Sequence, residues 1–244
     1  MAQIPATVAP VAELERRIQW RGVAVVVFVA MLAGLLVLAL LPVISPAPAL
    51  EGVPGDADVF AARELARGIA PSTGDDLRFF SAFLDADAVT HPFAAADAGR
   101  LAQSAALLRR ASERRPEELR TRVFLAHLDL AQRRYPPAER IYREVLDARA
   151  HTPEAHIGLG VTLALQALGD SDPMHARALQ LQSVAQFAAV RSKDAGYDAA
   201  LYDRAVMLDR VGRHGEARRR ALEYLKRDAG SAWAVKMREL IARR

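Results

Sequence analysis

The sequence predicts an all-α protein, with one transmembrane helix near the N-terminus followed by an array of antiparallel helical hairpins. Three observations predict this fold class. A long uncharged apolar run stands near the start of the chain, apolar residues beyond residue 56 recur at spacings of three and four, and proline and glycine divide that region into short segments. Spacings of three and four are typical of amphipathic helices, and no stretch alternates over the length expected of a strand. Short helices joined by short connections favour an α-solenoid.

Composition excludes several classes of protein. The chain has 244 residues, of which 52% are hydrophobic, 25% charged and 6% aromatic, and it contains no cysteine. The absence of cysteine excludes disulfide scaffolds, zinc knuckles, iron–sulfur clusters and thiol catalysis. Metalloprotease, serine-hydrolase, phosphate-loop and dinucleotide-binding motifs are also missing, and the six histidines fall in or beside different predicted helices. We therefore expect no enzyme activity, no metal and no cofactor.

The apolar run at residues 23–44 has no charged or strongly polar side chain. A helix of this length spans roughly 33 Å, enough for a hydrocarbon core of about 30 Å. We assign a transmembrane helix to residues 22–45, after a short tail at 1–21 and before a Pro/Gly tether at 46–56. Arginines precede the run, and the first basic residue after it is Arg63. The positive-inside tendency therefore places the tail in the cytoplasm and the C-terminal body on the periplasmic side of a bacterial inner membrane.

Two other interpretations of this run remain open. A cleaved signal peptide is one, because Ala47-Pro48-Ala49 resembles a cleavage site. Signal peptides, however, usually have apolar regions of about 7–15 residues, shorter than this one. A buried core helix is the other, although it would lack any polar face. In the membrane interpretation, Ala30 and Gly34 form a face of small residues suited to packing against another transmembrane helix.

Proline and glycine divide the rest of the chain into ten predicted helices. We assign residues 57–115 to N-terminal helical hairpins and residues 116–244 to repeats with a C-terminal capping helix. The predicted helices are 57–70, 75–87, 93–114, 116–133, 137–150, 153–168, 173–192, 196–211, 214–228 and 231–242.

Three stretches, beginning near residues 119, 153 and 198, share a pattern of small and bulky residues. The residues that carry it are Leu125, Ala126, Ala138 and Tyr142 in the first stretch, Leu159 and Gly160 in the second, and Leu201, Ala205, Leu208, Gly212 and Ala217 in the third. The first step is 34 residues, and the second, of 45, predicts an insertion around Ala167–Met174. In this pattern the chain resembles the tetratricopeptide-repeat family, although two of the three large aromatic residues expected in the best-matching stretch are missing. An irregular helical bundle is the alternative.

The resemblance implies that the first helices of successive hairpins line a concave groove that binds a partner. The family's groove positions fall on Arg120, Val123, His127, Leu130, Glu154, Ile157, Val161, Ala164, Ala199, Tyr202, Val206 and Asp209. This set is mostly apolar and lacks the lysines and asparagines that clamp a terminal carboxylate, so it suits an apolar helix or strand of a partner protein. Alternatively, its apolar members are core residues covered by the helix at 231–242, with Trp233 and Met237 as plugs.

Charge is unevenly distributed along the chain. Residues 51–90 hold eight acidic and three basic residues, whereas residues 199–244 hold twelve basic and six acidic residues. The basic C-terminal helices suit an acidic partner or anionic lipid, or they are the solvated face of an arginine-rich chain. No nucleic-acid partner is expected, because the body lies outside the cytoplasm and aromatic residues do not interleave with the basic ones.

Two functions fit these features. The first is a membrane-anchored extracytoplasmic scaffold that binds a protein partner in or at the inner membrane and acts in the assembly of a membrane or periplasmic complex. Its layout is similar to that of the tetratricopeptide factors of c-type cytochrome maturation and of translocon-associated helpers. The alternative is a stoichiometric accessory subunit of a respiratory, photosynthetic or secretion complex.

Overall fold

The computed structural model describes residues 56–70, 77–84, 91–92 and 94–242. The predicted tail, the transmembrane helix and its Ala30–Gly34 face lie outside the described residues. Within the described part, no helix is both long enough and apolar enough to cross a bilayer. The described residues are helical, apart from two strands of two residues each and the connecting segments.

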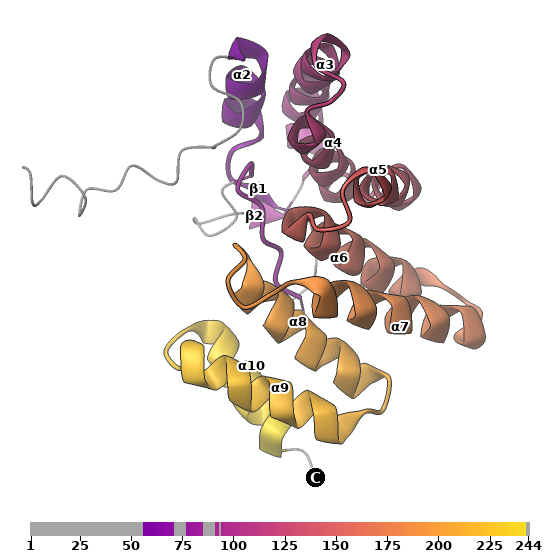
Figure 1. Ribbon diagram of the computed structural model, residues 1–244, viewed down its shortest axis with the longest axis vertical. Helices are drawn as coiled ribbons and strands as arrows, with labels where there is room; N and C mark the ends of the chain where they lie inside the picture. Colours follow the sequence, from indigo (N-terminus) through magenta and orange to yellow (C-terminus); the bar gives the residue numbers. More distant parts are fainter. Residues whose placement is uncertain (1–55, 71–76, 85–90, 93, 243–244) are drawn as a thin grey trace, which may run out of the picture. The chain divides into compact units, whose positions relative to one another are not determined.

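Successive helices along the chain pack on one another (Figure 1). The hairpins are α2 with α3, α4 with α5, α6 with α7 and α8 with α9, and α10 packs on α9 and α8. The helices are α2 (Ala57–Ala66), α3 (Ala98–Arg114), α4 (Leu119–Ala131), α5 (Tyr135–Ala148), α6 (Pro153–Gly169), α7 (Pro173–Ala189), α8 (Tyr197–Arg210), α9 (His214–Arg227) and α10 (Ala232–Ala242), with a short 3₁₀ turn η2 (Ala95–Asp97).

The last three hairpins share a polar clip across their turns. In each clip, an acidic residue at the end of the first helix bonds to a basic residue five positions later, at the start of the second helix. The pairs are Asp129 with Arg134, Asp170 with His175, and Asp209 with His214. A carboxylate at a helix C-terminus is unfavourable beside the helix dipole, and the basic partner offsets that cost. The clip therefore marks the same point in each repeat.

The spacing between the starts of successive hairpins agrees with the repeat expected from the sequence. Helix α4 begins at Leu119 and α6 at Pro153, whereas α8 begins only at Tyr197. The insertion predicted around Ala167–Met174 falls at the α6–α7 turn, which is itself as short as the others and lies between two longer helices. The extra residues instead lengthen α6 to 17 residues against 13 in α4, lengthen α7 to 17 against 14 in α5, and extend the α7–α8 connection.

Small residues in α6 allow its neighbours to approach closely. A Cβ added to Gly158 would lie 2.3 Å from Cζ of Tyr142 on α5, and one added to Gly160 would lie 2.6 Å from Cε1 of Phe187 on α7. Both rings are almost fully buried. Helix α6 is therefore packed between α5 and α7 with no room for a larger side chain at either glycine.

The chain between α2 and α3 departs most from the prediction. The predicted helix at 75–87 is wrong over the described residues, because residues 77–81 are neither helix nor strand and residues 82–84 form a turn. Strand β1 (Ile69–Ala70) pairs in parallel with β2 (His91–Pro92). In Figure 1, residues 77–84 are the violet line that runs from beside these strands to α8. We call residues 77–84 the internal segment.

Candidate functional site

The twelve predicted groove residues lie on α4, α6 and α8, the first helices of three hairpins, which contact one another. We call these twelve residues the groove face. Arg120, Glu154 and Asp209 are half-buried. The other nine are buried, namely Val123, His127, Leu130, Ile157, Val161, Ala164, Ala199, Tyr202 and Val206. The groove face is therefore not open to solvent, and its apolar residues are part of the core, which is the alternative that the sequence left open.

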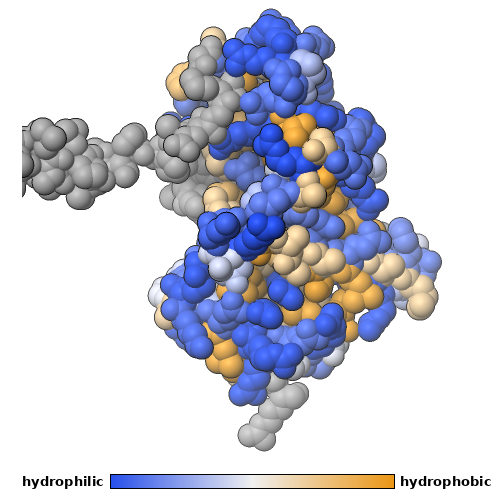
Figure 2. Space-filling model, viewed as in Figure 1, coloured by the Kyte–Doolittle hydropathy of each residue, from blue (hydrophilic) through white to orange (hydrophobic). Residues whose placement is uncertain are grey.

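Two parts of the chain cover the groove face. As predicted from the sequence, α10 is one of them, with the Trp233 ring 5.1 Å from that of Tyr202 and Met237 fully buried. The internal segment is the other, and the sequence did not predict it. Its Leu77 joins the same buried cluster as much of the groove face. Apolar side chains also show over α6, α7 and α8 in Figure 2, within a mostly hydrophilic surface.

At the α4 end, aromatic rings hold the internal segment. The Phe83 ring stacks on that of Phe124, with centroids 4.5 Å apart and planes inclined by 23°. Phe79 meets the His127 ring edge-on, with centroids 5.1 Å apart. Phe83 and Phe124 are fully buried. Ring pairs of this kind add to the free energy of burying the side chains themselves.

His127 on α4 is the polar contact at this end. Its Nδ1 lies 2.7 Å from the Ser81 hydroxyl, which also accepts a hydrogen bond of 3.1 Å from the Leu84 N–H. Burial lowers the pKa of His127 to about 3, so the ring is neutral at physiological pH. Which of Ser81 and His127 donates in this bond depends on the tautomer of the ring.

In the middle of the groove, α6 and the connection before α8 contact the internal segment. The Glu154 carboxylate accepts a hydrogen bond from the Ala82 N–H, and burial raises the pKa of Glu154 despite this bond and the nearby Arg120. The Phe80 ring lies against Gly196, where an added Cβ would be 2.6 Å from Phe80 Cδ1. The segment is thus recognised through its backbone as well as its side chains.

At the α8 end, Arg78 enters a polar and aromatic socket. Its backbone N–H donates to Oδ1 of Asp203 on α8 at 2.7 Å, and its Nη1 donates to the Tyr224 hydroxyl on α9 at 2.6 Å. The Tyr224 hydroxyl in turn donates to Oδ2 of Asp228 at 2.6 Å. The guanidinium also lies 5.6 Å from the centre of the Trp233 ring on α10. We call Asp203, Tyr224, Asp228 and Trp233 the arginine socket.

The two carboxylates of the arginine socket differ in electrostatic state. Hydrogen bonds from Ser231 and Tyr224 lower the pKa of Asp228 to about 2, so this carboxylate is charged at neutral pH. Burial raises the pKa of Asp203 well above its ordinary range. Among the described residues, Oδ2 of Asp203 has no hydrogen-bond partner. One oxygen of Asp203 is therefore used by the internal segment and the other is not.

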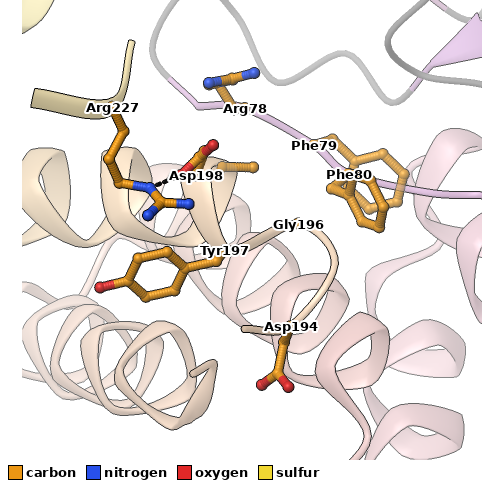
Figure 3. Close-up of a pocket in the computed structure, with 9 residues that line it drawn as sticks. Arg78, Phe79, Phe80, Asp194, Gly196, Tyr197, Asp198 and Arg227 are labelled. Carbon is orange, nitrogen blue, oxygen red and sulfur yellow. Dashed lines mark hydrogen bonds and ion pairs between the residues drawn. The ribbon is translucent and has the colours of Figure 1, made fainter. Parts of the chain in front are cut away.

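A cavity of about 180 Å³ lies between the internal segment and the start of α8 (Figure 3). Phe79 and Phe80 stand on one side of it, and an ion pair of Asp198 with Arg227 stands on another. The remaining lining residues are Arg78, Asp194, Gly196, Tyr197 and Ala199. The internal segment thus does not fill the space in front of α8.

The arrangement is suited to holding an extended polypeptide. It offers carboxylates to backbone N–H groups, buried surfaces to aromatic rings and a socket to a guanidinium. Within the part of the chain that the structure describes, no group of three or more histidine or acidic residues could hold a metal ion.

The sequence patterns predict neither the arginine socket nor the position of the internal segment. The socket combines residues of three helices that lie at no repeat position, so no periodic signal marks it. A signal for the segment was present, since three of the chain's eight phenylalanines fall within residues 79–83.

Three arginines of the basic C-terminal helices are held in local ion pairs. Arg213 pairs with Glu216, Arg220 with Glu223 and Arg227 with Asp198. Arg218 and Arg219 are exposed. The positive charge that faces solvent on α9 is therefore smaller than the count of arginines in the sequence suggests.

Comparison with known proteins agrees with the repeat architecture. Residues 95–160, which span η2, α3, α4, α5 and the first half of α6, match the tetratricopeptide repeat family. No curated protein and no solved structure matches the chain. The repeat suggests a scaffold for protein–protein interaction. Residues 95–160 of the chain thus carry a tetratricopeptide repeat, and the stacked hairpins agree with this assignment.

Proposed function

We propose that this protein is a scaffold that binds an extended segment of a partner polypeptide along the groove face of α4, α6 and α8. The observation that carries the proposal is that the groove face already holds an extended polypeptide, the internal segment. Asp203 and Glu154 bond to its backbone, and Phe124 and His127 pack on its rings. These are the contacts by which peptide-binding grooves recognise an extended chain.

The proposal includes a membrane anchor and an extracytoplasmic location. The uncharged run at residues 23–44 and the arginines before it support a single-pass anchor with the N-terminus in the cytoplasm. The partner would then be a protein in or at the inner membrane, and the scaffold would act in assembling a membrane or periplasmic complex. A periplasm-active reporter fused after Arg244 should be active, and an inactive reporter would reverse the topology.

A photo-crosslinking amino acid in place of Tyr197 tests the groove. Tyr197 lines the cavity and is half-buried, so a partner in the groove would lie beside it. A matched control carries the same amino acid in place of Leu222, which is exposed on α9. We expect light-dependent adducts with a partner polypeptide at position 197 and none at 222. Adducts at 222 alone, or at neither position in cells that depend on the protein, would contradict binding in the groove.

An accessory subunit of a larger membrane complex is the second candidate function. One observation favours it, because Leu168 is 59% exposed and Met174 is 76% exposed, on either side of the α6–α7 turn. A permanent partner would cover these apolar side chains. Purification in a mild detergent separates the two candidates, because equimolar recovery with one complex indicates a subunit, whereas recovery of substoichiometric partners indicates an assembly factor.

A further inference from the structure

The internal segment lies on the groove like a bound ligand. Arg78, near its start, reaches α8, α9 and α10, whereas Phe83, near its end, reaches α4. The segment therefore runs across the repeats in the order opposite to that of the chain. It contributes no helix to the stack, and its contacts with the groove are hydrogen bonds to side chains and packing of its own side chains.

The fit of this ligand is incomplete at the α8 end. The cavity of about 180 Å³ beside Phe79 and Phe80 is not filled, and Oδ2 of the buried Asp203 has no hydrogen-bond partner among the described residues. Buried polar atoms normally find partners. Another polypeptide with a larger side chain beside the cavity, and a hydrogen-bond partner for Oδ2, would satisfy both features. The groove thus accepts the internal segment without being shaped around it alone.

The arginine socket defines the chemistry of such a polypeptide. It binds the backbone N–H and the guanidinium of the same residue, and it places that guanidinium 5.6 Å from the Trp233 ring centre and 5.8 Å from that of Tyr224. A planar guanidinium can hydrogen-bond to Tyr224 while it lies over aromatic faces, whereas a lysine ammonium is a compact and strongly hydrated charge. The socket therefore favours arginine over lysine.

We infer that the internal segment is a replaceable occupant of the groove, and that it stands in for a partner segment that is extended and carries an arginine followed by aromatic residues. This inference rests on the proposed function and adds to it. The partner competes with residues 77–84, so the groove binds only a polypeptide that matches the arginine socket and the aromatic contacts well enough to displace them.

A peptide with the sequence of residues 77–84, labelled with a fluorophore and flanked by polar residues, tests the inference on the full chain in detergent. It is added to the wild type and to a variant in which residues 77–84 are replaced by glycine and serine. We expect the variant to bind the peptide at least about tenfold more tightly than the wild type, because no internal segment competes. A peptide with Arg78→Lys should bind the variant about tenfold more weakly, and a scrambled peptide should not bind.

The results that overturn the inference are specific. Equal binding of the peptide to the wild type and to the variant, or no binding to a variant that keeps its helical circular dichroism, shows that residues 77–84 are not a ligand of the groove. If the variant is unfolded, peptide added in trans should restore its helicity, and failure to do so shows that the segment is an integral part of the core. Equal affinity of the variant for the arginine and lysine peptides would show that the socket does not select arginine.

A second measurement uses the wild type alone. Amide hydrogen exchange at Arg78 should be at least about tenfold faster than at Val161 in α6, because the segment leaves the groove without global unfolding. Equal protection of the two amides overturns the inference. Crosslinking at position 197 separates this failure from a failure of the proposed function. If partner adducts form at 197 but the peptide does not bind, the scaffold function stands and only the arginine-containing ligand assigned to it is wrong. If the protein instead forms dimers in which the groove of one copy holds residues 77–84 of another, the occupant is a second copy of this chain, and the inference of a separate partner is overturned.

Discussion

The two ends of the groove hold the same eight-residue segment by different chemistry. At the α4 end the contacts are neutral and buried, with Phe83 on Phe124 and Ser81 bonded to an uncharged His127. At the α8 end they are polar, and a cavity remains beside Arg78. Truncating a buried phenylalanine to alanine costs about 3–5 kcal/mol, whereas a net hydrogen bond contributes about 1 kcal/mol. The difference indicates that the α4 end supplies most of the stability and the α8 end most of the selectivity.

Lowering the pH should reduce the stability that the α4 end contributes, because the packing at this end requires a neutral His127. In the unfolded chain this histidine takes up a proton near pH 6.5, and in the folded chain only near pH 3. The folded state binds fewer protons between these values, so stability is present above pH 6.5 and is lost as the pH falls towards 3. The loss amounts to roughly 5 kcal/mol for this one group.

Urea unfolding at a series of pH values between 7 and 3 measures this loss. We expect His127→Gln to remove most of the pH dependence in the acidic range, since glutamine has no group that titrates there. The wild-type chain, unfolded over the same pH range, is the reference. An unchanged slope in His127→Gln would show that this residue is not buried in a neutral state.

Removing an aromatic contact at the α4 end should have the next largest effect. Phe83→Ala should lower the free energy of unfolding by about 3–4 kcal/mol, with a coupling to Phe124→Ala of about 1 kcal/mol in a double-mutant cycle. Phe60→Ala is the control, because Phe60 is 66% exposed on α2 and its loss should cost within about 0.5 kcal/mol. Equal effects of Phe83→Ala and Phe60→Ala would contradict the packing of the internal segment.

Smaller changes are expected at the α8 end. Tyr224→Phe removes the hydroxyl that accepts from Arg78 and donates to Asp228, and should cost about 1–2 kcal/mol in chemical denaturation. Arg78→Lys should cost about 1 kcal/mol, whereas Arg219→Lys on the exposed face of α9 should be neutral. A loss as large as that of Phe83→Ala would reverse the assignment of stability to the α4 end.

The turns of the two end repeats provide the smallest and most closely matched comparison. Arg133 in the α4–α5 turn and Gly212 in the α8–α9 turn both adopt left-handed backbone conformations, with φ of 59° and 80°. Glycine adopts this conformation without steric cost, whereas arginine adopts it at a cost in free energy. Arg133→Gly should therefore raise the free energy of unfolding by about 0.5–1 kcal/mol, and Gly212→Ala should lower it by about 1 kcal/mol. Changes of the same sign would show that the two turns are not equivalent.

Much of the fold could be predicted from local signals. Pro153 and Pro173 stand at the first positions of α6 and α7, as proline does at helix starts, so the predicted helix starts at 153 and 173 are confirmed. The helix predicted at 75–87 failed because its conformation is set by distant groups. The Arg78 N–H bonds to Asp203, 125 residues away, and the Ser81 hydroxyl is used by His127. Contacts of this kind leave no periodic pattern in the sequence.

The site was predicted in part for the same reason. The family positions named the three helices that line the groove, because the 34-residue step from Leu125 to Leu159 fixes their register. They did not show that the internal segment covers part of the groove, since this segment precedes the repeats in the chain and belongs to no repeat. The cluster of phenylalanines at residues 79–83 is a signal that this segment is buried, but it does not show which helices the segment contacts.

The most direct test of the account is whether residues 77–84 lie on α4 in solution. The Phe83 and Phe124 ring centres are 4.5 Å apart, so their ring protons should give a nuclear Overhauser effect in the phenylalanine-labelled full chain in detergent. The account predicts this cross-peak, and predicts its loss in Phe83→Leu with the helical spectrum unchanged. A folded chain without the cross-peak would show that the groove is not occupied by its own segment.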